Sequence, residues 1–193
     1  MLRRLYDWTL SLGMRREAMW ALAIIAFIES SFFPIPPDVL LIPMVLAARD
    51  RAFVMAGVAT AASVLGGLAG YGIGYFLWET VGERLVAFYS WQAQMEEFAG
   101  AYNDWGAWIV LFFGITPFPY KLITIMSGVV ALDLWVFLAA SLVARGIRFY
   151  AVATLLWWFG PPIRGFIERR FGLVVTIFMV LLIGGFAAAL YLA

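Results

Sequence analysis

Long apolar runs without a charged side chain constrain this chain more than any other feature. Residues 52–78 and 171–193 contain no charged residue at all. A helix needs about 20 consecutive apolar residues to cross the hydrocarbon core of a bilayer. The composition agrees, because 65% of the 193 residues are hydrophobic and 13% are charged, against roughly 45–50% and about 25% in soluble domains. The sequence therefore predicts an all-α integral membrane protein, with residues 1–193 forming one membrane domain.

Prolines interrupt the first apolar segment. Residues 18–48 contain only two charged side chains, and Pro34, Pro36 and Pro37 stand near their middle. Because proline lacks a backbone donor and clashes with the preceding helical turn, one helix cannot pass smoothly through this run. We expect residues 18–48 to form a re-entrant hairpin, which enters and leaves the membrane on one side. A kinked span followed by a surface helix is the alternative.

A second apolar segment, residues 105–132, is interrupted in the same way by Pro117 and Pro119. The two interrupted runs align without a gap, and the aligned pairs are Pro34 with Pro117, Pro36 with Pro119, and Asp38 with Lys121. Paired proline-interrupted segments in two halves of a chain are typical of transporters built from inverted repeats. The sequence therefore predicts a second re-entrant hairpin that is related to the first.

Three segments are expected to cross the membrane as single helices: residues 52–78, 134–163 and 171–193. In the first of them, Gly66, Gly70 and Gly74 recur at every fourth position. Small residues at this spacing let another helix approach closely. We interpret these glycines as a packing surface without a chemical role.

Residues 79–104 are more polar than the rest of the chain. Aromatic and other apolar residues recur there at helical spacing, opposite Gln92, Gln94, Glu96 and Glu97; they are Phe88, Trp91, Met95, Phe98, Tyr102 and Trp105. Such a stripe indicates an amphipathic helix. We expect one helix over 79–104, lying in the periplasmic membrane interface; a cap packed on the membrane bundle is the alternative.

The distribution of charge predicts the orientation in the membrane. If the first hairpin opens to the cytoplasm and the second to the outside, the cytoplasmic segments hold Arg3, Arg4, Arg15, Arg16, Arg49, Arg51, Arg164, Arg169 and Arg170. The external segments then hold a single basic residue, Arg84, and six acids: Glu79, Glu83, Glu96, Glu97, Asp104 and Asp133. This is a strong positive-inside bias. It places the N-terminus in the cytoplasm and the C-terminus outside, and it orients the two hairpins oppositely.

Five charged residues remain at membrane depth: Glu29, Asp38, Lys121, Arg145 and Arg148. Each costs at least about 2.5–3.5 kcal/mol at the centre of a membrane helix unless it is paired or hydrated, so we expect them to share a polar cavity. The three bases suit an anionic headgroup, because guanidinium groups bind phosphate oxygens in a bidentate fork. Glu29 and Asp38 are expected to couple the step to protons, since a poorly solvated carboxyl titrates closer to neutral pH. Alternatively, the five form ion pairs that only hold the hairpins together.

The hydroxyl groups near the second turn are weaker candidates. Thr116, Thr124 and Ser127 follow or precede its prolines. Serine and threonine in membrane helices usually bond back to their own backbone. We therefore expect a structural role for these three.

Several motifs together resemble the DedA membrane-protein superfamily (VTT type), and most closely its YqaA-like branch. They are F-I-E-S-S-F-F-P-I-P-P-D from Phe27, T-P-F-P-Y-K from Thr116, M-S-G from Met126 and A-R-G-I-R-F-Y from Ala144. The resemblance covers roughly residues 20–160. It implies opposed re-entrant hairpins and the movement of phospholipids or polyprenyl phosphates between leaflets, driven by protons in bacteria. It carries the acidic positions onto Glu29 and Asp38, and the basic positions onto Lys121, Arg145 and Arg148.

One position departs from the family pattern. DedA proteins usually carry an arginine before the proline of the second hairpin and another after it, whereas Ile115 and Thr116 precede Pro117 here and Lys121 takes the later basic role. A lysine is a compact point charge, not a planar fork. The lipid that is recognised is therefore expected to differ.

The chain has no histidine and no cysteine, which removes the commonest general base and metal ligand and every thiolate nucleophile. We expect no enzymatic activity, cofactor, metal or nucleic-acid partner. The hypothesis is a flippase or scramblase-like lipid transporter of the bacterial inner membrane, whose partners are membrane lipids with anionic headgroups; the sequence also allows a homo-oligomer. The alternatives are a non-transporting scaffold or assembly and membrane-homeostasis factor and, less favoured, a membrane-embedded lipid enzyme.

Overall fold

The computed structural model describes residues 16–33, 36–116 and 118–160, and all regular structure in them is helical. The helices in chain order are α2 Arg16–Ser31, α3 Asp38–Ala47, α4 Ala52–Leu77, α5 Glu83–Phe88, α6 Gln92–Ile115 and α7 Tyr120–Val129, followed by the helix Leu134–Gly160. The all-α class is thus confirmed for these residues. Pro34, Pro117, the basic cluster at 164–170 and the expected span 171–193 lie outside the described residues.

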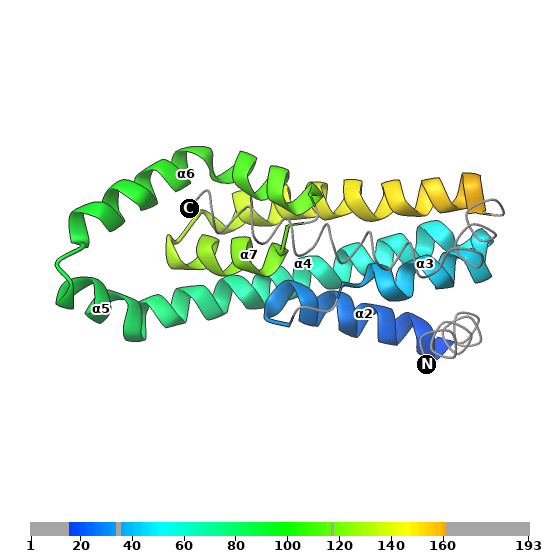
Figure 1. Cartoon of the computed structure of the whole chain (residues 1–193), viewed down its shortest axis with the longest axis horizontal. Coiled ribbons are helices and arrows are strands. Elements are labelled where there is room, and N and C mark those ends of the chain that lie inside the picture. Colours follow the sequence, from blue (N-terminus) through cyan, green and yellow to red (C-terminus); the bar gives the residue numbers. More distant parts are fainter. Residues whose placement is uncertain (1–15, 34–35, 117, 161–193) are drawn as a thin grey trace, which may run out of the picture.

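α4 and the Leu134–Gly160 helix run along the molecule, and α2, α3, α6 and α7 lie beside them (Figure 1). α4 and the Leu134–Gly160 helix run in opposite directions, while α2 and α3 lie beside one half of α4 and α6 and α7 beside the other. Two continuous helical stretches, Arg49–Phe88 and Leu134–Gly160, are long and apolar enough to cross a membrane, as judged by length and composition. The first of these includes the predicted span 52–78, and the second covers the described part of 134–163.

Both predicted helix breaks are confirmed. α2 ends at Ser31 and α3 begins at Asp38, after Pro37; α6 ends at Ile115 and α7 begins at Tyr120, after Pro119. Each break contains prolines, which remove helical hydrogen bonds. We call α2 with α3 the first proline unit and α6 with α7 the second proline unit. The C-terminal end of α2 and the N-terminal end of α7 meet about halfway along α4.

α3 belongs to the core of the first proline unit. Its side chains Leu41, Met44 and Val45 are fully buried, in a cluster with α2, α4 and the Leu134–Gly160 helix. A second cluster on the other half of α4 contains Tyr120 and Phe137. This burial favours the paired-helix prediction for residues 18–48 over a span followed by a peripheral surface helix.

The glycine stripe of α4 is the surface on which both proline units pack. A Cβ atom at Gly66 would collide with the backbone of Phe27 in α2, and one at Gly74 with the backbone of Ile125 in α7. Gly70 lies between them and faces both the Ser30 carbonyl and the Thr124 side chain. The predicted close approach is therefore confirmed, and it extends to two partner helices.

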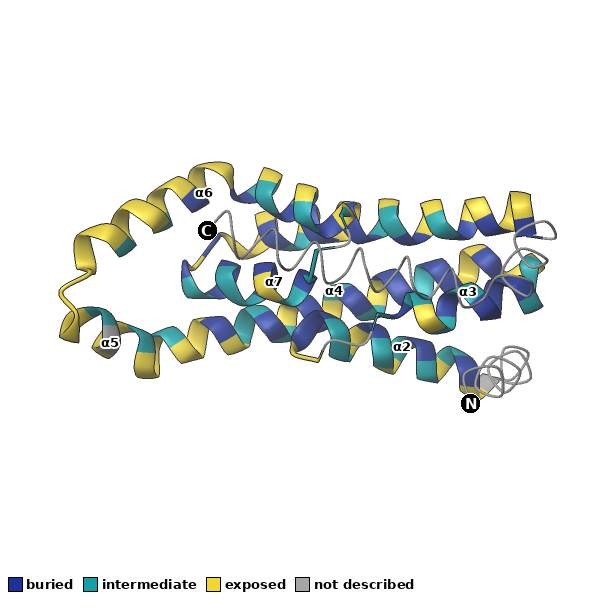
Figure 2. Cartoon of the chain, in the orientation of Figure 1, coloured by how far each residue is buried: buried dark blue, intermediate teal, exposed yellow. Residues whose placement is uncertain are grey.

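The prediction of one amphipathic helix over residues 79–104 is wrong. α4 continues through a π-helical turn, Trp78–Gly82, into α5, and the chain then reverses before α6 begins at Gln92. Ser90 adopts a left-handed conformation (φ 55°) at this reversal. The regular spacing of the aromatic residues misled the prediction, because a tight reversal can join two helices without disturbing that spacing. Figure 2 shows that exposed residues concentrate at this end of the molecule, where Phe88 is 80% exposed.

Candidate functional site

Glu29 and Arg145 form a buried ion pair between α2 and the Leu134–Gly160 helix. Arg145 Nη2 donates to Glu29 Oε2 over 2.9 Å, and the Arg145 and Glu29 side chains are 0% and 12% exposed. The two residues are 116 positions apart in sequence. Breaking such a pair by removing one partner would leave an uncompensated buried charge, which is strongly destabilising.

The environment of Arg145 is built from aromatic rings and hydroxyl groups. Its guanidinium carbon lies 4.8 Å from the centre of the Tyr120 ring and 4.7 Å from that of Phe149, distances at which a cation is attracted to a ring face. Arg145 Nε donates to Ser63 Oγ over 2.6 Å. Arg145 Nη1 is buried and has no hydrogen-bond partner among the described residues.

Asp38 and Arg148 form a second pair, which is more open. Arg148 Nη2 donates to Asp38 Oδ2 over 2.7 Å, and the side chains of Arg148 and Asp38 are 16% and 20% exposed. Arg148 Nη1 also approaches the backbone carbonyl of Thr116 at 3.5 Å. A single guanidinium thus contacts α3 of the first proline unit and the residue that follows α6 in the second. Asp38 Oδ1 is buried without a partner among the described residues.

We call Glu29, Asp38, Arg145 and Arg148 the central site. Arg145 and Arg148 lie one helical turn apart, so their guanidinium groups emerge on one face of the helix. Four of the five charges predicted to converge are therefore brought together by the fold. These four residues lie on α2, α3 and the Leu134–Gly160 helix.

Lys121 does not share these ion pairs. Its side chain is half-buried on α7 and makes no salt bridge with a described residue. Its backbone carbonyl accepts a hydrogen bond from Thr124 Oγ1 over 2.9 Å. Among the turn prolines, Pro37 is buried, and Pro36 and Pro119 are half-buried.

The three weaker hydroxyl candidates mostly have structural partners. Thr116 Oγ1 donates to the Phe113 carbonyl of its own helix, as expected. Thr124 Oγ1 approaches the Lys121 carbonyl and also the Ser30 carbonyl of α2. Ser127 Oγ shares a hydrogen bond of 3.1 Å with the Tyr102 hydroxyl.

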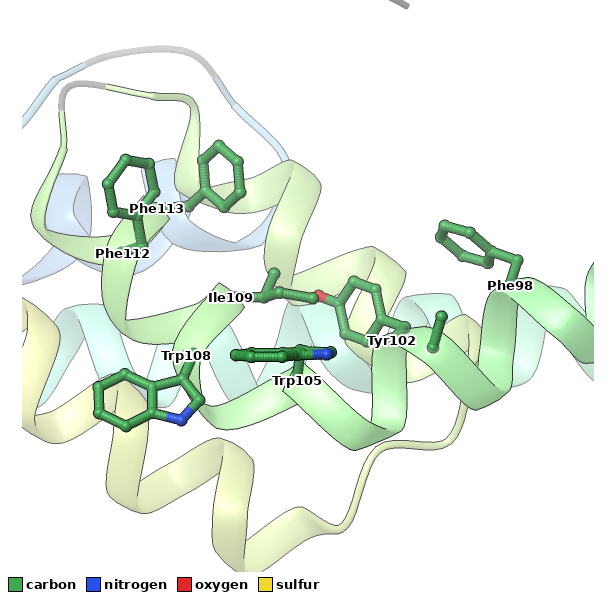
Figure 3. Close-up of a pocket in the computed structure, with 8 residues that line it drawn as sticks. Phe98, Tyr102, Trp105, Trp108, Ile109, Phe112 and Phe113 are labelled. Atoms are coloured by element: carbon green, nitrogen blue, oxygen red, sulfur yellow. The ribbon is translucent and has the colours of Figure 1, made fainter.

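An apolar pocket of about 450 Å³ lies on one side of α6. In Figure 3, Tyr102, Trp105 and Ile109 lie near its middle, Phe98 lies at one end, and Phe112 and Phe113 lie at the other. None of its lining residues carries a charge. It therefore suits hydrocarbon, and it is separate from the ion pairs of the central site.

Two curated proteins resemble the chain over most of its length. The Uncharacterized protein HI0703 homolog of Histophilus somni is 37% identical over 156 residues, which are 81% of this chain and 81% of that relative. The chain belongs to the same family. A further member, an Uncharacterized protein of Haemophilus influenzae, is 36% identical over 156 residues, again with 81% of each chain covered. No protein-family model matches the chain, and no solved structure matches it.

The uncharged residues that contact Arg145 were not predicted from the sequence. Ser63 lies in a charge-free helix, and nothing in its spacing distinguishes it from the alanines around it. Ser30 is adjacent to Glu29, and Tyr120 is adjacent to Lys121. Their position next to a predicted site residue is the sequence feature that could have indicated them. Tyr120 is fully buried and donates its hydroxyl hydrogen to Ser141 Oγ.

Proposed function

We propose that the chain is a lipid translocator of the DedA type in the bacterial inner membrane, moving an anionic phospholipid or a polyprenyl phosphate between leaflets. The observation that carries the proposal is the central site, where two arginines on one helix are each bound to a carboxylate of the first proline unit. The N-terminus would be cytoplasmic and the C-terminus periplasmic. The two proline units would be re-entrant hairpins that open to opposite sides.

The energetic cost of the central site supports a functional role. Replacing a buried ion pair by apolar residues of similar volume is often neutral or stabilising, so two such pairs are poorly explained by stability alone. Charged residues inside membrane proteins commonly mark the paths of substrates and ions. A phosphate is an anion like the carboxylates already bound to Arg145 and Arg148, and its oxygens accept hydrogen bonds from guanidinium groups in the same way.

In the proposed mechanism, the lipid headgroup replaces the carboxylates as the partner of the two arginines. Protonation of Asp38 would remove its charge and weaken its bond to Arg148, and the released guanidinium would then bind the headgroup. Arg148 is the first contact in this scheme because its pair is the more exposed one and lies against both proline units. Arg145 would bind the headgroup deeper in the protein, once Glu29 has released it, and Lys121 would contribute positive charge from α7.

The arrangement of the proline units supports access from both sides. α2 and α3 lie along one half of α4, α6 and α7 lie along the other half, and the C-terminal end of α2 contacts α7 near the middle. Non-helical backbone at membrane depth is tolerated where protein or a water-filled cavity covers it. Opposed hairpins would thus place the central site near the bilayer midplane, where inverted-repeat transporters bind their substrates.

The test is a headgroup-accessibility assay in proteoliposomes. An anionic lipid with a fluorescent headgroup is incorporated, and a membrane-impermeant reductant bleaches the outer leaflet; transport by the wild type should raise the bleached fraction above one half. Arg145→Ala and Arg148→Ala together should slow transport about tenfold or more, because a hydrogen bond to a charged group contributes about 1.5–3 kcal/mol. Wild-type rates from this double variant would overturn the proposal.

A charge-swapped variant separates transport from the scaffold alternative. Asp38→Arg with Arg148→Asp retains an ion pair between the same two helices but moves the cation to α3. A scaffold needs only the pair, so it predicts normal activity for the swapped protein. The proposed translocator predicts that the swapped protein stays folded and loses transport.

A further inference from the structure

Four hydrogen bonds close a ring around the buried ion pair. Arg145 Nε contacts Ser63 Oγ at 2.6 Å, Ser63 Oγ contacts Ser30 Oγ at 2.6 Å, Ser30 Oγ contacts Glu29 Oε2 at 3.1 Å, and Arg145 Nη2 contacts Glu29 Oε2 at 2.9 Å. Ser30 and Ser63 are both 0% exposed. The ring joins α2, α4 and the Leu134–Gly160 helix.

The direction of every bond in the ring follows from the chemistry of its ends. A guanidinium only donates and an ionised carboxylate only accepts. Each serine has one hydroxyl hydrogen, so Ser30 must give its hydrogen to Glu29, and Ser63 must give its own to Ser30. Two of the four bonds end on Glu29 Oε2, and hydrogen bonds to an ionised carboxylate are roughly twice as strong as those between neutral groups, so the ring favours the charged form of Glu29.

We infer that Ser30 and Ser63 are positioning residues that hold Glu29 in its charged form and fix the Arg145 guanidinium against it. The inference rests on the proposed function, and it concerns the control of the same site. When Glu29 takes up a proton, its carboxyl becomes neutral and its bonds to Ser30 and to Arg145 Nη2 weaken. Arg145 then keeps Ser63 and two aromatic rings as partners, and its charge is available to an anion.

Other titratable groups also surround this pair. Tyr120 of α7, Asp38 of α3 and Arg148 on the same helix as Arg145 all interact electrostatically with Arg145. α4 contributes the uncharged Ser63. Among the hydroxyl groups of the described residues, Ser30 alone donates to the Glu29 carboxylate, so its removal should act on the ionised form of Glu29 most directly.

The experiment is an infrared titration of the carboxyl band of Glu29, in protein reconstituted without any transported lipid. Glu29→Gln identifies the band by removing it. Ser30→Ala should shift the midpoint of its titration upward by about one pH unit, because the charged form loses one hydrogen bond. Ser63→Ala should shift it less in the same direction, and Ser30→Thr and Ser63→Thr, which keep the hydroxyl, should restore the wild-type midpoint.

Ser31→Ala is the matched control. Ser31 is the neighbouring buried serine, but it donates to the Phe27 and Gly66 carbonyls and does not touch the ion pair, so its variant should titrate like the wild type. The inference is overturned if the midpoint is the same in Ser30→Ala and Ser63→Ala as in the wild type, if Ser31→Ala shifts it equally, or if no band disappears in Glu29→Gln. A wild type that titrates as expected but moves no lipid would overturn the proposed function alone.

Discussion

Thr124 of α7 donates a hydrogen bond of 3.0 Å to the carbonyl of Ser30, 94 residues away at the C-terminal end of α2. The two proline units therefore contact each other directly, beside the glycine stripe of α4. Ser30 also belongs to the ring around Arg145, so the same residue contacts both the second proline unit and the buried ion pair. The packing of α7 on α2 therefore reaches the Glu29–Arg145 pair that the proposed mechanism uses.

Substitution of Gly70 should destabilise the contact between the proline units. In Gly70→Ala the added Cβ would lie 3.1 Å from the Ser30 carbonyl and would collide with Thr124 Oγ1. Overpacking of this kind costs about 1–3 kcal/mol, which thermal unfolding in detergent would detect. Gly72→Ala is the control, because nothing lies near its added Cβ, and it should unfold at or slightly above the wild-type temperature. Equal unfolding temperatures for the two variants would contradict the packing described for Gly70.

The two ion pairs should differ in their contribution to stability. Glu29→Gln leaves the fully buried Arg145 without a counter-charge, a change that costs about 3–5 kcal/mol. Asp38→Asn leaves Arg148, which keeps some access to solvent, so the loss should be nearer 1–2 kcal/mol. Unfolding temperatures should therefore fall in the order wild type, Asp38→Asn, Glu29→Gln. The reverse order of unfolding temperatures would mean that burial does not determine how much each ion pair contributes to stability.

Asp133 should act as the N-cap of the Leu134–Gly160 helix. Its Oδ1 accepts hydrogen bonds from the backbone N–H groups of Trp135 and Val136, over 3.0 and 2.9 Å. Asp133→Ala should cost about 0.5–2 kcal/mol of unfolding free energy, and Asp133→Ser should recover most of it. Asp104→Ala, at an exposed position of α6 without a side-chain hydrogen bond to a described residue, should have little effect. A loss in Asp104→Ala as large as that in Asp133→Ala would show a charge effect instead of capping.

Single cysteines can test the orientation, because the chain has none of its own. Asp50 is exposed between α3 and α4, and Gln92 is exposed at the start of α6. In intact cells an impermeant maleimide should label Gln92→Cys from outside and should reach Asp50→Cys only after the inner membrane is permeabilised. Labelling of both from one side would contradict the opposed hairpins.

Much of the helical framework could be predicted from local sequence. Proline cannot occupy a helix interior without losing a hydrogen bond, so the breaks before Asp38 and Tyr120 follow from the residues themselves. The glycine spacing of α4 predicted close helix contacts for a similar local reason. The reversal at Ser90 was missed, because no proline or glycine stands there and the helical spacing continues across it.

The sequence by itself determined which charged residues interrupt the apolar segments and where the helices must end, since hydrophobicity and backbone chemistry act over a few residues. Only the tertiary structure decided that Arg145 pairs with Glu29 and Arg148 with Asp38, that Lys121 stands outside these pairs, and that Ser30 and Ser63 complete the ring. Those partners are brought together by the packing of α2 and α7 on α4. Hydrogen-bond geometry between such distant residues depends on that packing, and a local pattern does not contain it.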